Sequence, residues 1–265
     1  GIINPLDIKK AIQKNTLLTS VMYVNNEIGT VQPIQKIGKL LKEINSNTPN
    51  TKHKILFHTD ATQAINYFDC NIEKLGVDLL SFSSHKIYGP KGIGILYVRK
   101  ETPIRRIQDG GDQEFFLRAG THNVPGIVGL AEAIRQVQSL KFKVQNKKII
   151  KLRNYLINKV IKEIPDVKLN GSLKFRSPNN ANFTFKNVEG ESLLLALDIE
   201  GIACSTGSAC STGSLSPSHV LLALGMKAEE AHGSLRITLG KATTKQEIDT
   251  FIFKLKSIIK GLRKI

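Results

Sequence analysis

Residues 79–100 read LLSFSSHKIYGPKGIGILYVRK, and this stretch decides the fold class. An apolar run leads into a glycine-rich turn and a second apolar run follows, which predicts two strands joined by a tight turn. The glycines do not mark a nucleotide-phosphate loop, because no GK[ST] occurs and a strand rather than a helix comes next. Lys86 therefore stands directly after a predicted strand.

The residues before this stretch alternate strand-like runs with a helix-like one. Residues 16–24 and 54–60 are short apolar runs typical of strands, and apolar residues at helical spacing lie between them over residues 34–44. A strand, helix, strand order predicts a parallel sheet with crossover connections. We therefore expect an α/β protein whose large domain, residues 1–142, contains a mostly parallel sheet.

The pattern changes in the second half of the chain. Residues 124–164 form a long helical pattern, and short strands mixed with helices follow Pro165. This change predicts a smaller α+β domain over residues 143–265.

The composition limits the classes of partner and site. The net charge of +16 would attract nucleic acid, but the lysines are spread along the chain without a basic arm, so we do not expect a nucleic-acid partner. No apolar run is long enough to cross a membrane, so we expect no membrane partner. The three cysteines include no CxxC pair. We therefore expect no disulfide framework, no metal site, and a reducing, cytoplasmic location.

Polar side chains follow three successive predicted strands. Asn26 comes after the first strand, Asp60 ends the second, and Lys86 follows the third. Ligands of parallel α/β sheets bind beyond the carboxyl ends of the strands, where these groups would converge. A lone lysine there is more often a solvated loop residue. A lysine that forms a Schiff base, together with a carboxylate that keeps a pyridine nitrogen protonated, is the pair that pyridoxal phosphate requires.

Residues 203–214 read ACSTGSACSTGS, so the unit CSTGS occurs twice. We expect Cys204 to end an apolar strand and to be buried and inert. Cys210 lies among small residues with little bulk to pack, which favours an exposed, reactive thiol. A redox pair of the two cysteines remains the alternative. Cys70 is expected to be an ordinary, partly buried cysteine.

Six ordered blocks resemble the cysteine desulfurases of the class V aminotransferase family, most closely the branch that serves iron-sulfur cluster assembly and nitrogen fixation. This resemblance implies a fold-type I enzyme that uses pyridoxal 5'-phosphate. The blocks are VNNEIGTVQPI (24–34), HTDATQAI (58–65), SFSSHKIYGPKGIGILYVRK (81–100), LRAGTHNVPGIVGLAEA (117–133), NVEGESLLLAL (187–197) and STGSACSTGSLSPSHVLLALGM (205–226).

The resemblance also implies site residues. Lys86 would form the Schiff base with the cofactor, Asp60 would pair with the ring nitrogen, and Thr121 would reach the phosphate of the second subunit in a homodimer. The cofactor-binding positions carried over are Asn26, Asp60, Gln63, Ser83, His85, Lys86 and Thr121. Asn182 and Arg236 match positions that bind the substrate carboxylate, and Cys210 matches the cysteine that carries sulfur.

The activity implied by the resemblance is conversion of L-cysteine to L-alanine. The sulfur would remain as a persulfide on Cys210 until it passes to an acceptor such as an iron-sulfur scaffold protein. A selenocysteine lyase or another class V enzyme is one alternative. A catalytically silent fragment or a basic binding module is the alternative from another class.

The sequence departs from the family pattern in two places. The family's amino-terminal portion, with a second phosphate-binding loop and a histidine that stacks on the cofactor, has no counterpart, so we expect this chain to be a fragment. Phe115 and Phe116 stand where the family usually has a less bulky pair that includes glycine.

Overall fold

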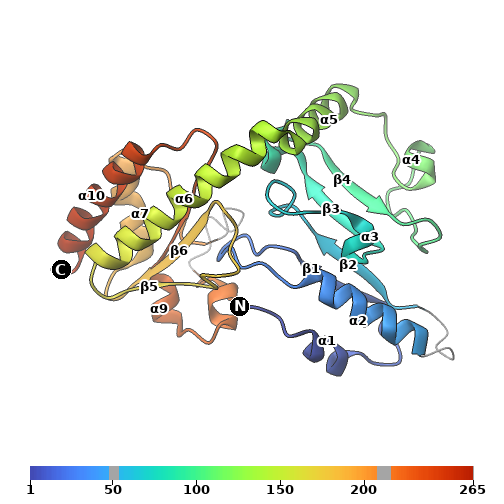
Figure 1. The fold of residues 1–265 in the computed structure, drawn as a ribbon, viewed down its shortest axis with the longest axis horizontal. Helices are drawn as coiled ribbons and strands as arrows, with labels where there is room; N and C mark the ends of the chain where they lie inside the picture. The colour runs from blue at the N-terminus through green and yellow to red at the C-terminus, as the bar shows by residue number, and fades with distance from the viewer. Residues whose placement is uncertain (48–53, 208–215, 265) are drawn as a thin grey trace. The chain divides into compact units, whose positions relative to one another are not determined.

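The structure is a computed structural model that describes residues 1–47, 54–207 and 216–264 (Figure 1). Its described residues divide into two compact units. We call residues 3–24 and 32–142 the lysine unit, because they include Lys86. The cysteine unit consists of residues 1–2, 25–31 and 143–265, and its sequence includes Cys210.

The lysine unit is built on a sheet in the order β1-β2-β3-β4 (Figure 1). The strands are β1 (Leu18–Met22), β2 (Leu56–Asp60), β3 (Leu79–Ser83) and β4 (Gly94–Val98). The first three are parallel, and β4 turns back antiparallel to β3. The expected α/β class with a mostly parallel sheet is therefore confirmed, and the glycine-rich turn joins two neighbouring strands.

Helices of the lysine unit connect and cover these strands. They are α1 (Pro5–Ala11), α2 (Ile34–Asn47), α3 (Ile72–Leu75), the 3₁₀ helix η1 (Ser84–Ile87), α4 (Gln113–Phe116) and α5 (Val124–Gln138). Gly38 lets the backbones of α2 and α3 approach closely, because a Cβ there would lie 2.2 Å from the carbonyl oxygen of Leu75. The helix expected over residues 34–44 therefore packs against α3 at a position where only glycine fits.

The phenylalanine pair lies in an unusual backbone conformation. Phe115 and Phe116 have φ values of 56° and 65°, in the left-handed region that bulky residues rarely adopt. Both side chains are exposed, at 91% and 64%. This departure from the family pattern therefore places two apolar rings on the surface just before Thr121.

The cysteine unit combines a small antiparallel sheet with helices. Its strands are β5 (Val167–Leu169), β6 (Asn180–Phe185) and β7 (Ser234–Thr238), in that order. Every residue of the central strand β6 is buried. The helices are α6 (Leu140–Glu163), α7 (Gly190–Ile199), α8 (His219–Ala223), α9 (Ala228–His232) and α10 (Lys245–Leu262). A reciprocal capping box of Thr244 and Glu247 begins α10.

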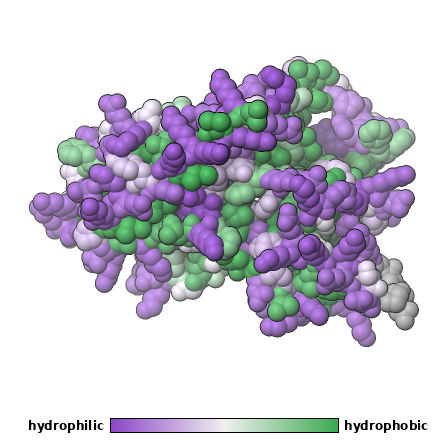
Figure 2. Space-filling view, in the orientation of Figure 1, coloured by the Kyte–Doolittle hydropathy of each residue, from purple (hydrophilic) through white to green (hydrophobic). Residues whose placement is uncertain are grey.

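Hydrophilic side chains are spread widely over the face in Figure 2, as expected from the diffuse charge. Within the described ranges, no helix has the length and apolar character that a membrane crossing needs. The same residues contain no group of His, Cys, Asp or Glu side chains suited to hold a metal ion.

Candidate active site

The ends of β2 and β3 bring a carboxylate and an amine-bearing turn to one edge of the sheet. β2 ends at Asp60, and β3 ends at Ser83, where η1 with Lys86 begins. The pairing continues past β2, because the amide of Ala61 donates to the carbonyl of Ser81 at 2.8 Å. Neighbouring parallel strands therefore place both groups at the carboxyl edge, where α/β sheets bind ligands.

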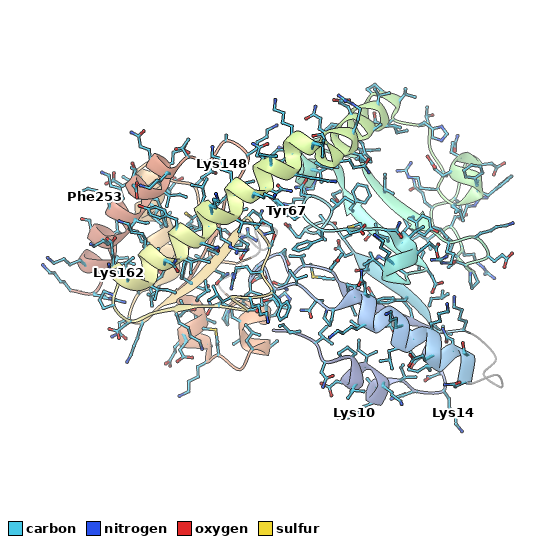
Figure 3. All side chains as sticks on the ribbon, viewed as in Figure 1. Lys10, Lys14, Tyr67, Lys148, Lys162 and Phe253 are labelled. Atoms are coloured by element: carbon cyan, nitrogen blue, oxygen red, sulfur yellow. The ribbon has the colours of Figure 1, made fainter. Side chains whose placement is uncertain are left out.

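Two contacts hold the turn after β2 against the turn after β3. The side-chain amide of Asn66 donates to the carbonyl of Lys86 at 2.6 Å. Tyr67, labelled in Figure 3, is hydrogen-bonded to Tyr88. Burial foremost, and then the neighbouring Tyr88, raises the pKa of Tyr67 well above its ordinary value. The sequence analysis missed this pair of contacts, because neither residue follows a strand directly.

The side chains at this edge are open to a ligand. His85 and Lys86 are exposed, and Asp60, Gln63 and Ser83 are half-buried. Asp60 is oriented by its own turn, because its Oδ1 accepts the amide of Thr62 at 2.8 Å. The structure thus places these five expected residues at the ends of β2 and β3 or in the turns that directly follow them.

This set of groups fits pyridoxal phosphate by its chemistry. An amine suits the cofactor's carbonyl carbon, a carboxylate suits its pyridine nitrogen, and hydroxyl and imidazole groups suit its phosphate. A further hydroxyl is available in the same turn, because Ser84 is buried and its Oγ has no hydrogen-bond partner among the described residues. Such an unpaired buried hydroxyl is costly unless a ligand or water satisfies it.

A row of polar side chains supports the face of the sheet that carries Asp60. His58 lies two residues before Asp60 on β2, so both side chains point to the same face. The ring nitrogens of His58 lie 2.8 Å from Ser20 Oγ on β1 and 3.0 Å from Ser81 Oγ on β3. Burial lowers the pKa of His58, and the nearby Asp60 carboxylate opposes that shift.

Thr121 is exposed and lies between α4 and α5 in the lysine unit. The next helix begins three residues later at Val124, and the side chain of Asn123 caps it by accepting the amide of Gly126. Its expected reach to a second subunit stays a prediction.

In the cysteine unit, residues 25–31 form a segment that we call the strap. Side chains from elsewhere in this unit donate to three consecutive carbonyls of the strap. Arg236 Nη1 donates to the carbonyl of Asn26 at 3.1 Å, and Arg176 Nη1 donates to that of Ile28 at 2.8 Å. Between them, Asn180 and Asn182 both donate to the carbonyl of Glu27.

Asn182 and Arg236 thus lie in the same unit and both contact the strap that carries Asn26. Arg236 is half-buried, but Asn182 is fully buried. The Oδ1 of Asn182 accepts a hydrogen bond from Asn170 Nδ2 at 2.8 Å, and its Nδ2 donates to the carbonyl of Glu27 in the strap. Binding of a substrate carboxylate by Asn182 stays a prediction, whereas its role in holding the strap is a feature of the structure.

Cys204 does not end a strand, and this expectation was wrong. Helix α7 ends at Ile199, and Gly201 adopts a left-handed φ of 75° that turns the chain back. The described chain after this turn pairs with β7 through an isolated bridge of Ser205 and Arg236. The apolar residues before Cys204 therefore belong to a helix and its exit turn, whose short apolar pattern resembles that of a strand. Cys210 lies outside the described residues.

The two described cysteines have suppressed thiolate character. Burial raises the pKa of the Cys204 thiol to about 11. Burial first, and then the nearby Asp69 carboxylate, raises the pKa of Cys70 to about 12. Since the thiolate is the nucleophile, Cys204 fits the inert role expected of it, and Cys70 is partly buried as expected.

A thiol-alkylation experiment checks these two pKa shifts. At about pH 8 we expect iodoacetamide to modify Cys204 and Cys70 at least ~100-fold more slowly than free cysteine, because only a minute fraction of each is thiolate. Peptide-resolved mass spectrometry across a pH series measures both rates. A rate near that of free cysteine at either position would contradict the burial described above.

Comparisons with known proteins place the chain. The aminotransferase class-V family matches residues 1–251. Cysteine desulfurase IscS of Dictyoglomus turgidum is 50% identical over 265 residues, covering 100% of this chain and 65% of the relative. Cysteine desulfurase IscS of Methanosarcina thermophila is 46% identical over 263 residues, covering 99% of this chain and 62% of the relative. The chain thus spans somewhat less than two thirds of these curated relatives.

Solved structures give the same result for the fold. A NifS-like protein superimposes with a TM-score of 0.85 at 35% identity, covering 98% of this chain and 66% of its own. SspA in complex with cysteine superimposes with a TM-score of 0.72 at 35% identity, covering 92% of this chain and 64% of its own. The family model matches most of the chain, and the turn with Lys86 and the carboxylate of Asp60 lie at adjacent strand ends. This chain therefore belongs to the aminotransferase class-V family.

Proposed function

We propose that this chain is the larger part of a pyridoxal-phosphate-dependent cysteine desulfurase, which converts L-cysteine to L-alanine and retains the sulfur as a persulfide on Cys210. The observation that carries the proposal is the juxtaposition of the Lys86 turn and Asp60 at neighbouring strand ends. The relatives that are 46–50% identical along the chain are named cysteine desulfurases.

The lysine unit would bind and tune the cofactor. Lys86 would attach it through the side-chain amine and move the α-proton of the substrate. Asp60 would hold the proton on the ring nitrogen, which gives the bound cofactor its capacity to accept electrons. Gln63, together with Asn26 from the strap of the cysteine unit, would bind near the phenolic oxygen. Ser83 and His85 would hold the phosphate, with Thr121 contributed by the second subunit of a homodimer.

The cysteine unit would bind the substrate and accept its sulfur. The guanidinium of Arg236 suits the substrate carboxylate, with Asn182 as the second expected contact. The Cys210 thiolate would attack the substrate sulfur, so that an S–S bond forms while the substrate's Cβ–S bond breaks. The electron pair of that bond stays on Cβ, which is then protonated to give the methyl group of alanine.

The persulfide would then pass to an acceptor such as an iron-sulfur scaffold protein in the cytoplasm. A selenocysteine lyase on the same fold is the near alternative, and comparing selenide with sulfide release separates the two. A catalytically silent binding module is less consistent with the chain, because it retains Lys86, Asp60 and Cys210 together.

The proposal is tested by adding pyridoxal phosphate to the 265-residue chain. We expect a visible absorbance band from a Schiff base with Lys86, and Lys86→Ala should remove that band. L-Cysteine and a reductant are then added, and sulfide and alanine are measured.

The same assay is repeated with an amino-terminal segment from a relative supplied separately. A Lys86-dependent band and sulfide release under either condition support the proposal. Absence of both, with and without the added segment, would overturn it.

A further inference from the structure

Glu27 is a buried carboxylate in the strap for which the proposed reaction has no use. Only 2% of its surface is exposed. Its Oε2 accepts a hydrogen bond from Ser218 Oγ at 2.5 Å, a short contact typical of a hydroxyl bonded to a charged carboxylate. Because a buried charge is costly unless it is hydrogen-bonded, this contact holds both residues in place.

Ser218 is the residue at which the chain re-enters regular structure after the cysteine-bearing residues. It is the N-cap of α8, and its Oγ also accepts the amide of Leu221 at 3.2 Å. Leu221 is fully buried in a core cluster with Ile28 of the strap. The carboxyl side of residues 208–215 is therefore fixed to Glu27 through one hydroxyl.

The amino side of the same residues also lies beside Glu27. A Cβ built on Gly207 would lie 3.7 Å from Glu27 Oε2. Just before it, the amide of Ser205 donates to the carbonyl of Arg236, and the amide of Arg236 donates back to the carbonyl of Ser205. The chain thus enters and leaves residues 208–215 next to one carboxylate oxygen.

The backbone of Glu27 is itself fixed from the opposite side. Its carbonyl accepts from Asn180 Nδ2 at 3.0 Å and from Asn182 Nδ2 at 3.2 Å, and both asparagines belong to the fully buried strand β6. A carboxylate on such a backbone has little freedom to move. It binds the carboxyl flank of the cysteine-bearing residues through Ser218 and lies close to the amino flank at Gly207.

We propose that Glu27 is a positioning residue for Cys210. Glu27 fixes the positions of the residues that flank the segment with Cys210. It follows Asn26 in the chain, and the proposed function assigns Asn26 to the cofactor. The catalytic role of Glu27 rests on the proposed function, whereas its position beside the two flanks does not. Correct placement of a nucleophile accounts for a large share of the rate of an intramolecular step, so a loose anchor should slow sulfur transfer.

Two variants test the proposal on the protein loaded with pyridoxal phosphate, with the amino-terminal segment supplied if the spectrum requires it. Glu27→Gln keeps the shape and one acceptor but removes the charge, and Ser218→Ala removes the hydroxyl. Glu163→Gln is the matched control, because it also removes a charge from the cysteine unit, where Glu163 pairs with Lys159 and Lys256.

Hydrogen exchange of the amides of residues 205–207, 216 and 218–222 is the first measurement, because it does not depend on activity. We expect exchange in both flanks to be at least about fivefold faster in Glu27→Gln and in Ser218→Ala, and unchanged in Glu163→Gln. The second measurement is persulfide formation in a single turnover, which we expect to fall about tenfold or more while the cofactor absorbance stays unchanged.

The two measurements separate failure of this inference from failure of the proposed function. Unchanged exchange in both flanks overturns the positioning role, whether or not the protein is active. Faster exchange with a normal rate of persulfide formation also overturns it, because the flanks would then not matter for the reaction. If the wild-type protein forms no persulfide, the proposed function fails, and the exchange data alone decide whether Glu27 anchors the two flanks.

Discussion

Cys210→Ser should abolish desulfuration of L-cysteine, with a loss of at least about 1,000-fold in the rate of sulfide release, because a serine hydroxyl is not a nucleophile for sulfur under these conditions. Cys204→Ser should keep most of the activity. Burial raises the pKa of Cys204 to about 11, so its thiol is largely protonated and a poor nucleophile.

Sulfide release and alanine formation are measured side by side for the two variants, with the cofactor spectrum as a check that both bind pyridoxal phosphate. A redox pair would require both thiols, so equal losses would favour that alternative. A larger loss in Cys204→Ser than in Cys210→Ser would overturn the assignment of the sulfur-carrying residue.

Arg176→Met should lower the free energy of unfolding by about 3–5 kcal/mol, because it leaves several buried carbonyls without a donor. The guanidinium of Arg176 is almost fully buried and donates to the carbonyl of Ser172 at 2.9 Å, to that of Ile28 at 2.8 Å, and to that of Asn170. Arg176 Nη1 also donates to Asn180 Oδ1 at 3.1 Å. Burial, and then repulsion from Arg153, lowers the pKa of Arg176 to about 10.

Urea denaturation followed by circular dichroism measures the change. Arg135→Met is the matched control, because Arg135 makes an exposed ion pair with Glu132 on one helix turn and should leave the midpoint unchanged. An equally small shift for both variants would show that the strap does not depend on Arg176.

The sequence predicted those parts of the fold and site that depend on local pattern. Asp60 and Lys86 were found because each directly follows an apolar run, and the carboxyl ends of parallel strands share one edge. The contacts of Asn66 and Tyr67 with the Lys86 turn were not found. They join residues that neither alternate nor recur, so no periodicity marks them.

The strap could not be predicted for a different reason. Its carbonyls are bound by side chains far away in the sequence, with Asn26 and Arg236 separated by 210 positions. Asn182 was assigned to the substrate from the resemblance, and its burial against Glu27 depends on strand pairings that a single sequence does not reveal. Cys204 was misplaced because a short apolar run fits either a helix or a strand.

The strap also bears on how the protein is made. Residues 25–31 are synthesised before Asn180, Asn182 and Arg236, which bind their carbonyls and lie 153 to 210 positions later in the chain. The full set of these hydrogen bonds can therefore form only after Arg236 has been synthesised, so the strap waits for the far end of its own unit.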